Sequence, residues 1–287
     1  MLSKNELSNI EEIISDSIQS VLSVHGGSIN QAFLLKTKKS KFFLKKNNRI
    51  KFPEMFEVEK KGLQLLQNNS GLTIPKVDSV LNIGDNSYLI LEWIEEGNSR
   101  DDLFFDFGRN VALMHNHSSE IFGLGYDNYI GSLKQVNHFT DNWNDFFIEY
   151  RLGYLSKMAF DNGNIDKKST DNLEKLYLKL NDFFPLEKPS LLHGDLWGGN
   201  FMFSQNGDAV VYDPAVYYGH RLMDLGMSKL FGGFQSEFYE GYQSVYELDT
   251  NWKDAIHIAN LYPLLVHLNL FGTSYLIQIK EILKKYV

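Results

Sequence analysis

The stretch Leu192-His193-Gly194-Asp195-Leu196-Trp197-Gly198-Gly199-Asn200 carries a carboxylate and an amide close together, and Asp213 follows thirteen residues after Asn200. The residues from 201 to 212 predict two short strands joined by a turn at 204–208. Because a hairpin returns the chain to its starting point, we expect Asn200 and Asp213 to lie side by side, with Asp195 on the adjoining loop. One amide and one carboxylate suit Mg²⁺, which takes few protein ligands and completes its shell with water and phosphate oxygens.

A third carboxylate beside such a metal site can accept the proton of a hydroxyl group, as phosphoryl transfer requires. Taken singly, each of these residues is more often an ordinary turn residue, since Asp, Asn and Gly favour loops. Together, the spacing of Asp195 and Asn200 and the later Asp213 match the catalytic loop and the metal-binding aspartate of protein kinases, although Pro214-Ala215 stands in place of Phe-Gly. The motif therefore predicts Asp195 as the base and Asn200 and Asp213 as Mg²⁺ ligands.

A kinase also needs a lysine on the third strand of its first lobe, which contacts the nucleotide phosphates and pairs with a glutamate on the next helix. Lys45, in the expected strand 42–45, fits that position. Either Glu57 or Glu59 can be its partner, because spacing alone allows both. We expect the neighbouring lysines of this hairpin to be solvated.

Two further segments are candidates for nucleotide binding. A glycine turn between the first two expected strands can cover phosphates with its N–H groups, although alone it is equally compatible with a plain hairpin. Without the Gly-Lys-Ser/Thr ending of a Walker loop, the turn excludes a P-loop NTPase by motif. Its residues are Gly26, Gly27, Ser28, Ile29 and Asn30. At the end of the expected strand 88–94, Glu92, Trp93 and Ile94 can face an adenine ring.

Hydropathy patterns predict an α+β protein with two lobes that meet after residue 95. The ATP-binding lobe, residues 1–95, is expected to hold a five-stranded antiparallel sheet with strands 20–24, 31–35, 42–45, 77–80 and 88–94, and helices 7–19 and 52–67. The catalytic and substrate-binding lobe, residues 96–287, is expected to be mainly helical around one extended region, 190–212. Its helices are expected near 101–117, 141–162, 168–183, 220–230, 235–246, 252–271 and 274–285.

The composition excludes several classes of protein. Hydrophobic residues make up 43% of the 287 residues, which is typical of a folded chain. The absence of cysteine excludes disulfides, thiol nucleophiles and zinc ribbons. A net charge of −8 argues against nucleic-acid binding. With neither a secretory signal nor an apolar run of about 20 residues, we expect a cytoplasmic protein outside the membrane; its oligomeric state stays open.

The residues around the catalytic motif resemble the fructosamine kinase family. The resemblance rests on the nine residues quoted above, on the run Tyr212-Asp213-Pro214-Ala215-Val216-Tyr217-Tyr218-Gly219-His220-Arg221 and on Met223-Asp224-Leu225. It extends from about residue 20 to the end, with further matching stretches at 27–31, 55–59, 74–77, 127–131 and 267–272.

This resemblance implies a protein-kinase-like fold, ATP and Mg²⁺, and transfer of phosphate to O3 of the sugar of ketosamines: ribulosamines, erythrulosamines or fructosamines on free or protein-bound amines. The phosphorylated adduct is unstable and releases the amine, a deglycation. Carried over to this chain, the family pattern makes Asp195 the base, Asn200 and Asp213 the Mg²⁺ ligands and Glu59 the partner of Lys45. Glu92, Trp93 and Ile94 would face adenine.

Some assignments remain open. Trp197, Tyr217 and His220 are candidates for the ketosamine pocket, which needs an apolar wall with a few polar groups, whereas Asp224 is expected to be a buried anchor of the catalytic loop. Leu222 stands where the family commonly has glutamate, so selectivity can differ. A small-molecule kinase of the aminoglycoside, choline or homoserine type is the alternative within this class, and Trp197 argues against it. A catalytically silent ATP-binding protein is the alternative outside it.

Overall fold

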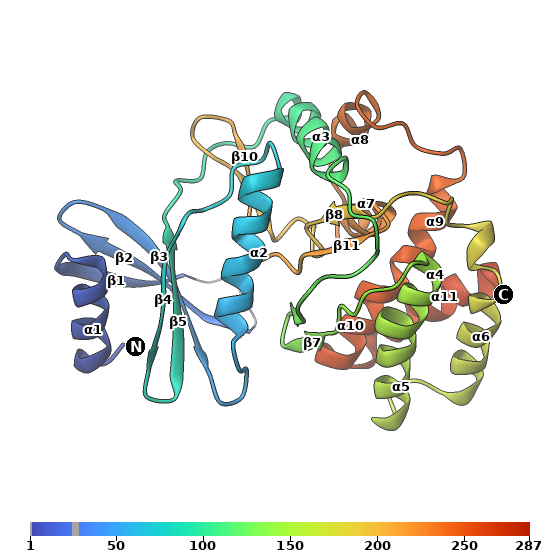
Figure 1. Cartoon of the computed structure of the whole chain (residues 1–287), viewed down its shortest axis with the longest axis horizontal. Helices are drawn as coiled ribbons and strands as arrows, with labels where there is room; N and C mark the ends of the chain where they lie inside the picture. Colours follow the sequence, from blue (N-terminus) through green and yellow to red (C-terminus); the bar gives the residue numbers. More distant parts are fainter. Residues whose placement is uncertain (1, 25–28) are drawn as a thin grey trace.

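The computed structural model describes residues 2–24 and 29–287 as a sheet followed by a mainly helical part (Figure 1). The sheet, drawn in blue to cyan, has five antiparallel strands in the order β1-β2-β3-β5-β4, which confirms the expected architecture. Its strands are β1 (Ile18–Val24), β2 (Gln31–Thr37), β3 (Lys41–Asn48), β4 (Val77–Ile83) and β5 (Asn86–Glu92).

One helix covers each face of the sheet, α1 (Lys4–Ile14) on the outside and α2 (Met55–Asn69) toward the helical part (Figure 1). Side chains of β5 alternate between the two: Tyr88 and Ile90 join Ile10 of α1 in one apolar cluster, whereas Leu89 and Leu91 join the cluster that contains α2. This alternation is that of a strand buried on both faces.

The prediction of a first helix reaching residue 19 is wrong. The helix ends at Ile14, Ser15 adopts the left-handed conformation with a φ of 52°, and Ile18 begins β1 opposite Thr37. Ile18 continued the helical spacing of the isoleucines by coincidence, because its β-branched side chain is equally suited to a strand.

Glu6 ties α1 to the sheet. Its carboxylate accepts hydrogen bonds from the backbone N–H of Ser3 at 2.6 Å, from Lys46 Nζ at 2.6 Å and from the Tyr88 hydroxyl. Burial acts to raise the pKa of Glu6, but the hydrogen bonds from Lys46, Tyr88 and Ser3 outweigh it and lower the pKa to about 2. The folded protein therefore favours the ionised carboxylate.

We expect Glu6→Gln to lower the free energy of unfolding at pH 7 by about 1–3 kcal/mol, the range for a buried charged hydrogen-bonding group. A depressed pKa stabilises the fold above the ordinary glutamate pKa, and this stabilisation is lost as the pH falls toward 2. Urea unfolding at pH 7 and at pH 3 should thus show a gap between wild type and variant that narrows in acid. A gap of the same size at both pH values would contradict this role of Glu6.

The helical part contains the expected helices with three interruptions (Figure 1). Region 141–162 forms two helices, Trp143–Phe147 and Tyr154–Asp161, with a π-helical turn at Ile148–Gly153 between them. Region 168–183 ends in a 3-10 turn at Leu180–Asp182. Region 252–271 divides into two helices at Asn260, and Pro263 lies in the first turn of the second, where a missing N–H is tolerated. Its helices are α3 (Asp101–His115), α4 (Trp143–Phe147), α5 (Tyr154–Asp161), α6 (Lys167–Tyr177), α7 (Leu222–Lys229), α8 (Ser236–Gln243), α9 (Trp252–Ala259), α10 (Leu261–Phe271) and α11 (Leu276–Tyr286), the last preceded by a 3-10 turn at Thr273–Tyr275.

Three short antiparallel strand pairs lie among these helices. The pair β9 (Phe201–Phe203) and β10 (Ala209–Val211) is the hairpin expected from the sequence. In the pair β8 (Ser190–Leu192) and β11 (Tyr217–Gly219), the sequence analysis expected the first strand but not the second. It expected neither strand of the pair β6 (Asn128–Ile130) and β7 (Leu133–Gln135). Together, β8 and the hairpin place the quoted motif next to the sheet.

Helices α3 and α8 cross with their backbones in close contact. A Cβ added to Gly108 would overlap the carbonyl oxygen of Phe238, and one added to Gly241 would overlap that of Phe105. Glycine is therefore required at both positions. Within the described residues, none of the helices combines the length and apolar character needed to cross a membrane.

Candidate active site

The loop between β8 and β9 holds Asp195 beside Asn200. The side-chain amide of Asn200 donates to the carboxylate of Asp195 at 2.7 Å and to its backbone carbonyl at 2.9 Å. Gly194 has a φ of 82°, and a Cβ there would overlap the carbonyl oxygen of Ala215, so only glycine fits this turn. The backbone thus fixes the position of the candidate base.

Asp224, on α7, anchors the start of this loop. Its two carboxylate oxygens accept hydrogen bonds from the backbone N–H groups of His193 at 2.7 Å and Gly194 at 2.9 Å. One of them also lies 3.2 Å from Nε2 of His115, whose other ring nitrogen is 2.8 Å from the Tyr242 hydroxyl. The anchor expected for Asp224 is present and extends to α3 and α8.

We expect Asp224→Asn to lower the free energy of unfolding by about 2–4 kcal/mol and to reduce the transfer rate as well. One carboxylate oxygen becomes an NH₂ group facing a donor, which leaves a buried N–H without an acceptor. Urea unfolding and steady-state kinetics would measure both effects. Asp208→Asn, a substitution of the same kind at a turn, is the matched control; equal results for the two variants would contradict the anchoring role.

Burial raises the pKa of Asp195 to about 7, and the charges of Asp213 and Asp224 act in the same direction, while the hydrogen bond from Asn200 acts against them. Burial also lowers the pKa of His193, whose Nε2 lies 3.1 Å from the carbonyl oxygen of Tyr212. Near neutral pH, therefore, Asp195 is poised to gain or lose a proton, whereas His193 stays neutral and structural.

Lys45 links the sheet to the residue that follows the β9–β10 hairpin. Its buried Nζ lies 2.5 Å from Glu59 of α2 and forms a second ion pair with Asp213, which follows β10. Glu57 is exposed, so the geometry distinguishes the two glutamates that spacing left open. Burial acts to lower the pKa of Lys45, but the charges of Asp213 and Glu59 outweigh it and raise the pKa, which keeps Lys45 protonated.

Asp213 adopts a left-handed backbone conformation with a φ of 57°. This region is uncommon outside glycine, and residues held in it cluster at functional sites. Here it directs one carboxylate oxygen to Lys45, immediately before the Pro214-Ala215 pair.

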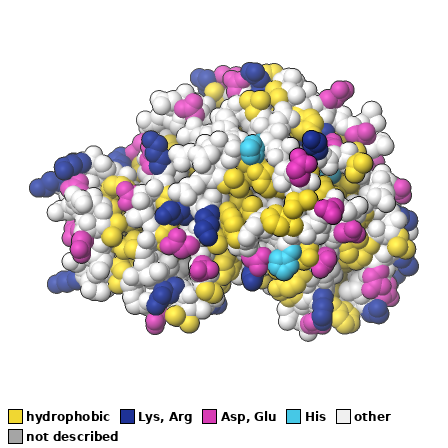
Figure 2. Space-filling view, viewed as in Figure 1, with side chains coloured by type: hydrophobic (Ala, Val, Ile, Leu, Met, Phe, Trp, Pro, Cys, Tyr) yellow, Lys and Arg dark blue, Asp and Glu magenta, His cyan; other side chains and the backbone are white. Residues whose placement is uncertain are grey.

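A cavity of about 930 Å³ lies between the sheet and the helical part. Most of the predicted site residues line it: Ile29, Asn30, Lys45, Glu59, Glu92, Trp93, Ile94, Asp195, Trp197, Asn200, Asp213 and Tyr217. Gly26, Gly27 and Ser28 lie outside the described residues. Figure 2 shows hydrophobic side chains gathered in the middle of the face where the sheet meets the helices.

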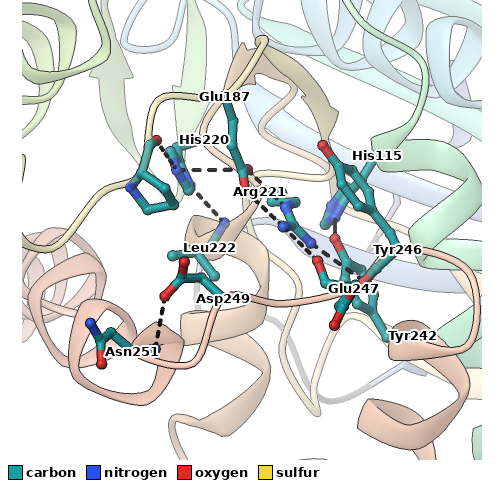
Figure 3. Close-up of polar contacts among 11 residues, drawn as sticks. His115, Glu187, His220, Arg221, Leu222, Tyr242, Tyr246, Glu247, Asp249 and Asn251 are labelled. Atoms are coloured by element: carbon teal, nitrogen blue, oxygen red, sulfur yellow. Dashed lines mark hydrogen bonds and ion pairs between the residues drawn. The ribbon is translucent and has the colours of Figure 1, made fainter.

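The structure does not bring His220 to this cavity. Its ring is buried against Phe184, with centroids 5.1 Å apart, and its Nε2 lies 3.2 Å from the carbonyl oxygen of Pro185. The adjacent Arg221 forms a two-pronged ion pair with Glu187 (Figure 3). The expectation that His220 lines a substrate pocket is therefore corrected, because the polar run after Tyr217 turns into the core. Leu222 is likewise buried there.

Sequence reasoning missed a second group of cavity residues, on α7, α10 and the turn that follows α10. They are Met223, Met227, Tyr262, Val266, His267, Leu270, Phe271 and Tyr275. Their spacing is that of ordinary buried helices, so no local signal distinguishes them from core residues.

Comparison with known proteins shows the family to which this chain belongs. The model of the fructosamine kinase family matches residues 3–287. The chain belongs to the fructosamine kinase family. It is therefore a phosphotransferase with an alcohol group as acceptor, as the resemblance to the fructosamine kinase family predicted.

Relatives of the same family agree over nearly their whole length. A protein from Synechocystis named "Probable ketoamine kinase" is 38% identical, with 93% of this chain and 90% of the relative covered. A rice (Oryza sativa subsp. japonica) protein named "Protein-ribulosamine 3-kinase, chloroplastic" is 37% identical over 94% of this chain and 79% of its own length.

Solved structures match in the same way. A candidate fructosamine-3-kinase from Haemophilus somnus has a TM-score of 0.88 and 26% identity, covering 98% of this chain and 96% of its own. An aminoglycoside phosphotransferase crystallised with AMP-PNP and hygromycin B has a TM-score of 0.69 at 12% identity, with 97% of each chain covered. The latter likeness shows a shared kinase-like fold.

Proposed function

We propose that this fructosamine kinase family member transfers the γ-phosphate of ATP to O3 of the sugar of a ketosamine, either free or attached to a protein. The observation that carries the proposal is the convergence of Asp195, Asn200, Asp213 and the Lys45–Glu59 pair in one cavity. A relative of 37% identity carries the name of a ribulosamine 3-kinase, which supports this acceptor class.

The nucleotide would occupy the sheet side of the cavity, bounded by residues of 1–95, with the acceptor against residues of 96–287. Glu92 ends β5 and Trp93 and Ile94 follow it; all three line the cavity, where their backbone groups would meet the adenine. Ile29 and Asn30 line it at the start of β2, and we extend this phosphate-covering role to Gly26, Gly27 and Ser28 on the sequence alone. Lys45 would contact the phosphates.

The donor set fits Mg²⁺. Asn200 uses its Nδ2 toward Asp195, which leaves Oδ1 for a cation, and Asp213 gives one carboxylate oxygen to Lys45, which leaves the other. Among the described residues, no group of three His, Asp or Glu side chains is placed to hold a metal, so the ion would depend on nucleotide phosphates and water as well. When bound, Mg²⁺ would neutralise charge on the phosphates.

The chemistry left to the protein is the movement of one proton. Asp195 would accept the proton of the C3 hydroxyl group while that oxygen forms a bond to the γ-phosphorus and the bond to the β–γ bridging oxygen breaks, so that ADP leaves. A pKa of about 7 keeps a substantial fraction of Asp195 ionised near neutral pH and makes that carboxylate basic enough to take a proton. Trp197 and Tyr217 line the acceptor side and are proposed to contact the sugar.

The test is ³¹P NMR of the protein with Mg²⁺ and ATP and, in separate samples, ribulosyl-lysine, fructosyl-lysine and an aminoglycoside. A new sugar-phosphate signal coupled to the proton on C3 is expected with a ketosamine, and the size of the signal ranks the two sugars. Glycated lysozyme in a fourth sample asks whether protein-bound adducts react. Transfer to the aminoglycoside alone would contradict the proposal and leave only the shared fold.

A further inference from the structure

A cluster of aromatic rings from three separate segments lies at one wall of the cavity. Trp197 comes from the catalytic loop, Phe231 from the connection between α7 and α8, and His267, Phe271 and Tyr275 from α10 and the turn after it. We call these five residues the aromatic corner. All except Phe231 line the cavity that contains Asp195.

Phe231 joins the other members from outside. Its ring centroid lies 4.6 Å from that of His267, 6.0 Å from that of Trp197 and 6.1 Å from that of Tyr275. His267 and Tyr275 are themselves 5.0 Å apart. These separations are those of rings in direct contact, so the corner is one packed unit.

The backbone at Phe231 is unusual. It adopts a left-handed conformation with a φ of 54°, although Gly232 and Gly233, which also have positive φ, follow at once. Phe234 then anchors the connection in the core, with its ring 4.8 Å from that of Phe201 and its N–H donating to Ser228 at 2.8 Å. An aromatic residue in this region is strained, and such outliers point to a functional constraint on the side chain.

The aromatic corner contains no carboxylate of its own. The acidic residues that line the cavity are Glu59, Glu92, Glu96, Asp195 and Asp213, and none comes from α10 or the turn after it. Burial lowers the pKa of His267, so this ring is neutral as well. A cation at this wall would be recognised by aromatic faces.

We propose that the aromatic corner binds the amine end of the acceptor as its substituted ammonium, through the faces of Trp197, His267 and Tyr275, with Phe231 holding these rings in place. This inference rests on the proposed function. In a ketosamine, two carbon atoms separate the nitrogen from C3, so a C3 hydroxyl at Asp195 leaves the nitrogen inside the same cavity, which Trp197, two residues further along the loop, also lines. The protein would then recognise the amine of the acceptor as well as its sugar.

The test compares two acceptors of the same shape that differ in charge: the ketosamine of ribulose with propylamine, and 1-O-propyl-ribulose, an uncharged ether. For the wild type we expect a KM about 2–30-fold lower for the amine than for the ether, the range of a cation held by aromatic faces. Tyr275→Leu and Phe231→Gly should each raise the KM of the amine more than that of the ether. Phe160→Leu, at a half-exposed position on α5, is the matched control and should leave the ratio of the two KM values unchanged.

Glycine at position 231 accepts a φ of 54° without strain, which offsets part of the ring packing and unfolded-state entropy that Phe231→Gly costs; urea unfolding measures the remainder. The ratio of the two KM values separates the proposed role from folding, because a loss of stability alone would not favour one acceptor over the other. Equal KM values for amine and ether in the wild type, or variants that raise both equally, would overturn the inference alone. Transfer to neither acceptor by the wild type would instead overturn the proposed function, and the inference with it.

Discussion

Asp195→Asn is expected to lower kcat for phosphoryl transfer by about 10²–10⁴-fold, the usual contribution of a positioned base. Asparagine preserves the size of the side chain, and its carbonyl oxygen can still accept the 2.7 Å hydrogen bond from Asn200, but it cannot take up a proton. Affinity for the nucleotide should stay close to that of the wild type. Quenched-flow transfer assays and a titration with a fluorescent ATP analogue measure the two quantities separately.

A second measurement distinguishes the loss of a base from a damaged loop. Because the pKa of Asp195 is raised to about 7, the ionised carboxylate destabilises the fold, and the wild type should lose stability as the pH rises from about 4 to 7. Asp195→Asn lacks this loss, so its free energy of unfolding should exceed that of the wild type at pH 8. A variant that is inactive and also less stable at pH 8 would point to structural damage instead.

Lys45→Met is expected to have two large effects at once. It removes the cation that faces both Glu59 and Asp213, which leaves the carboxylate of Glu59 enclosed without a partner; breaking a buried pair in this way costs about 3–5 kcal/mol of stability. It also removes the proposed phosphate contact, so the KM for ATP should rise and kcat should fall. Urea unfolding and initial rates over a range of ATP concentrations test both.

The double variant Lys45→Met/Glu59→Gln separates these effects. Neutralising Glu59 removes the enclosed charge, so the double variant should regain most of the lost stability while its KM for ATP stays high. If recovery of stability brought back activity, Lys45 would be a structural ion pair and not a nucleotide contact.

The arrangement of the candidate catalytic residues could be predicted from the sequence because its members are local. A hairpin over 201–211 brings Asn200 and Asp213 together, and the lysine on β3 pairs with a glutamate of the following helix. Spacing alone left Glu57 and Glu59 open; the family resemblance favoured Glu59, and Glu59 forms the ion pair with Lys45. The five strands were predictable from their own hydropathy patterns, whereas the pairing of β3 with β5, across the insertion of α2 and β4, was not.

Apart from Trp197 and Tyr217, the helical wall of the cavity could not be predicted, because it depends on long-range packing. His220 belongs to the same conspicuous run as Asp213 yet turns into the core, whereas His267 and Tyr275 look like members of an ordinary buried helix and line the cavity. Phe231 gives no sign in the sequence of its left-handed backbone beyond the two glycines that follow it. Cavity-lining residues on helices can be identified only once the positions of the helices around the cavity are known.

The contact between α3 and α8 through Gly108 and Gly241 couples a remote crossing to the catalytic loop. His115 of α3 and Tyr242 of α8 meet just beyond it, and His115 in turn touches the aspartate that holds the backbone of His193 and Gly194. A single added methyl group at either glycine would force the two helices apart and separate the two rings. A substitution at Gly108 or Gly241, neither of which lines the cavity, would then change the reaction rate through this chain of packed residues. Residues that affect the reaction therefore include some that are far from the substrate.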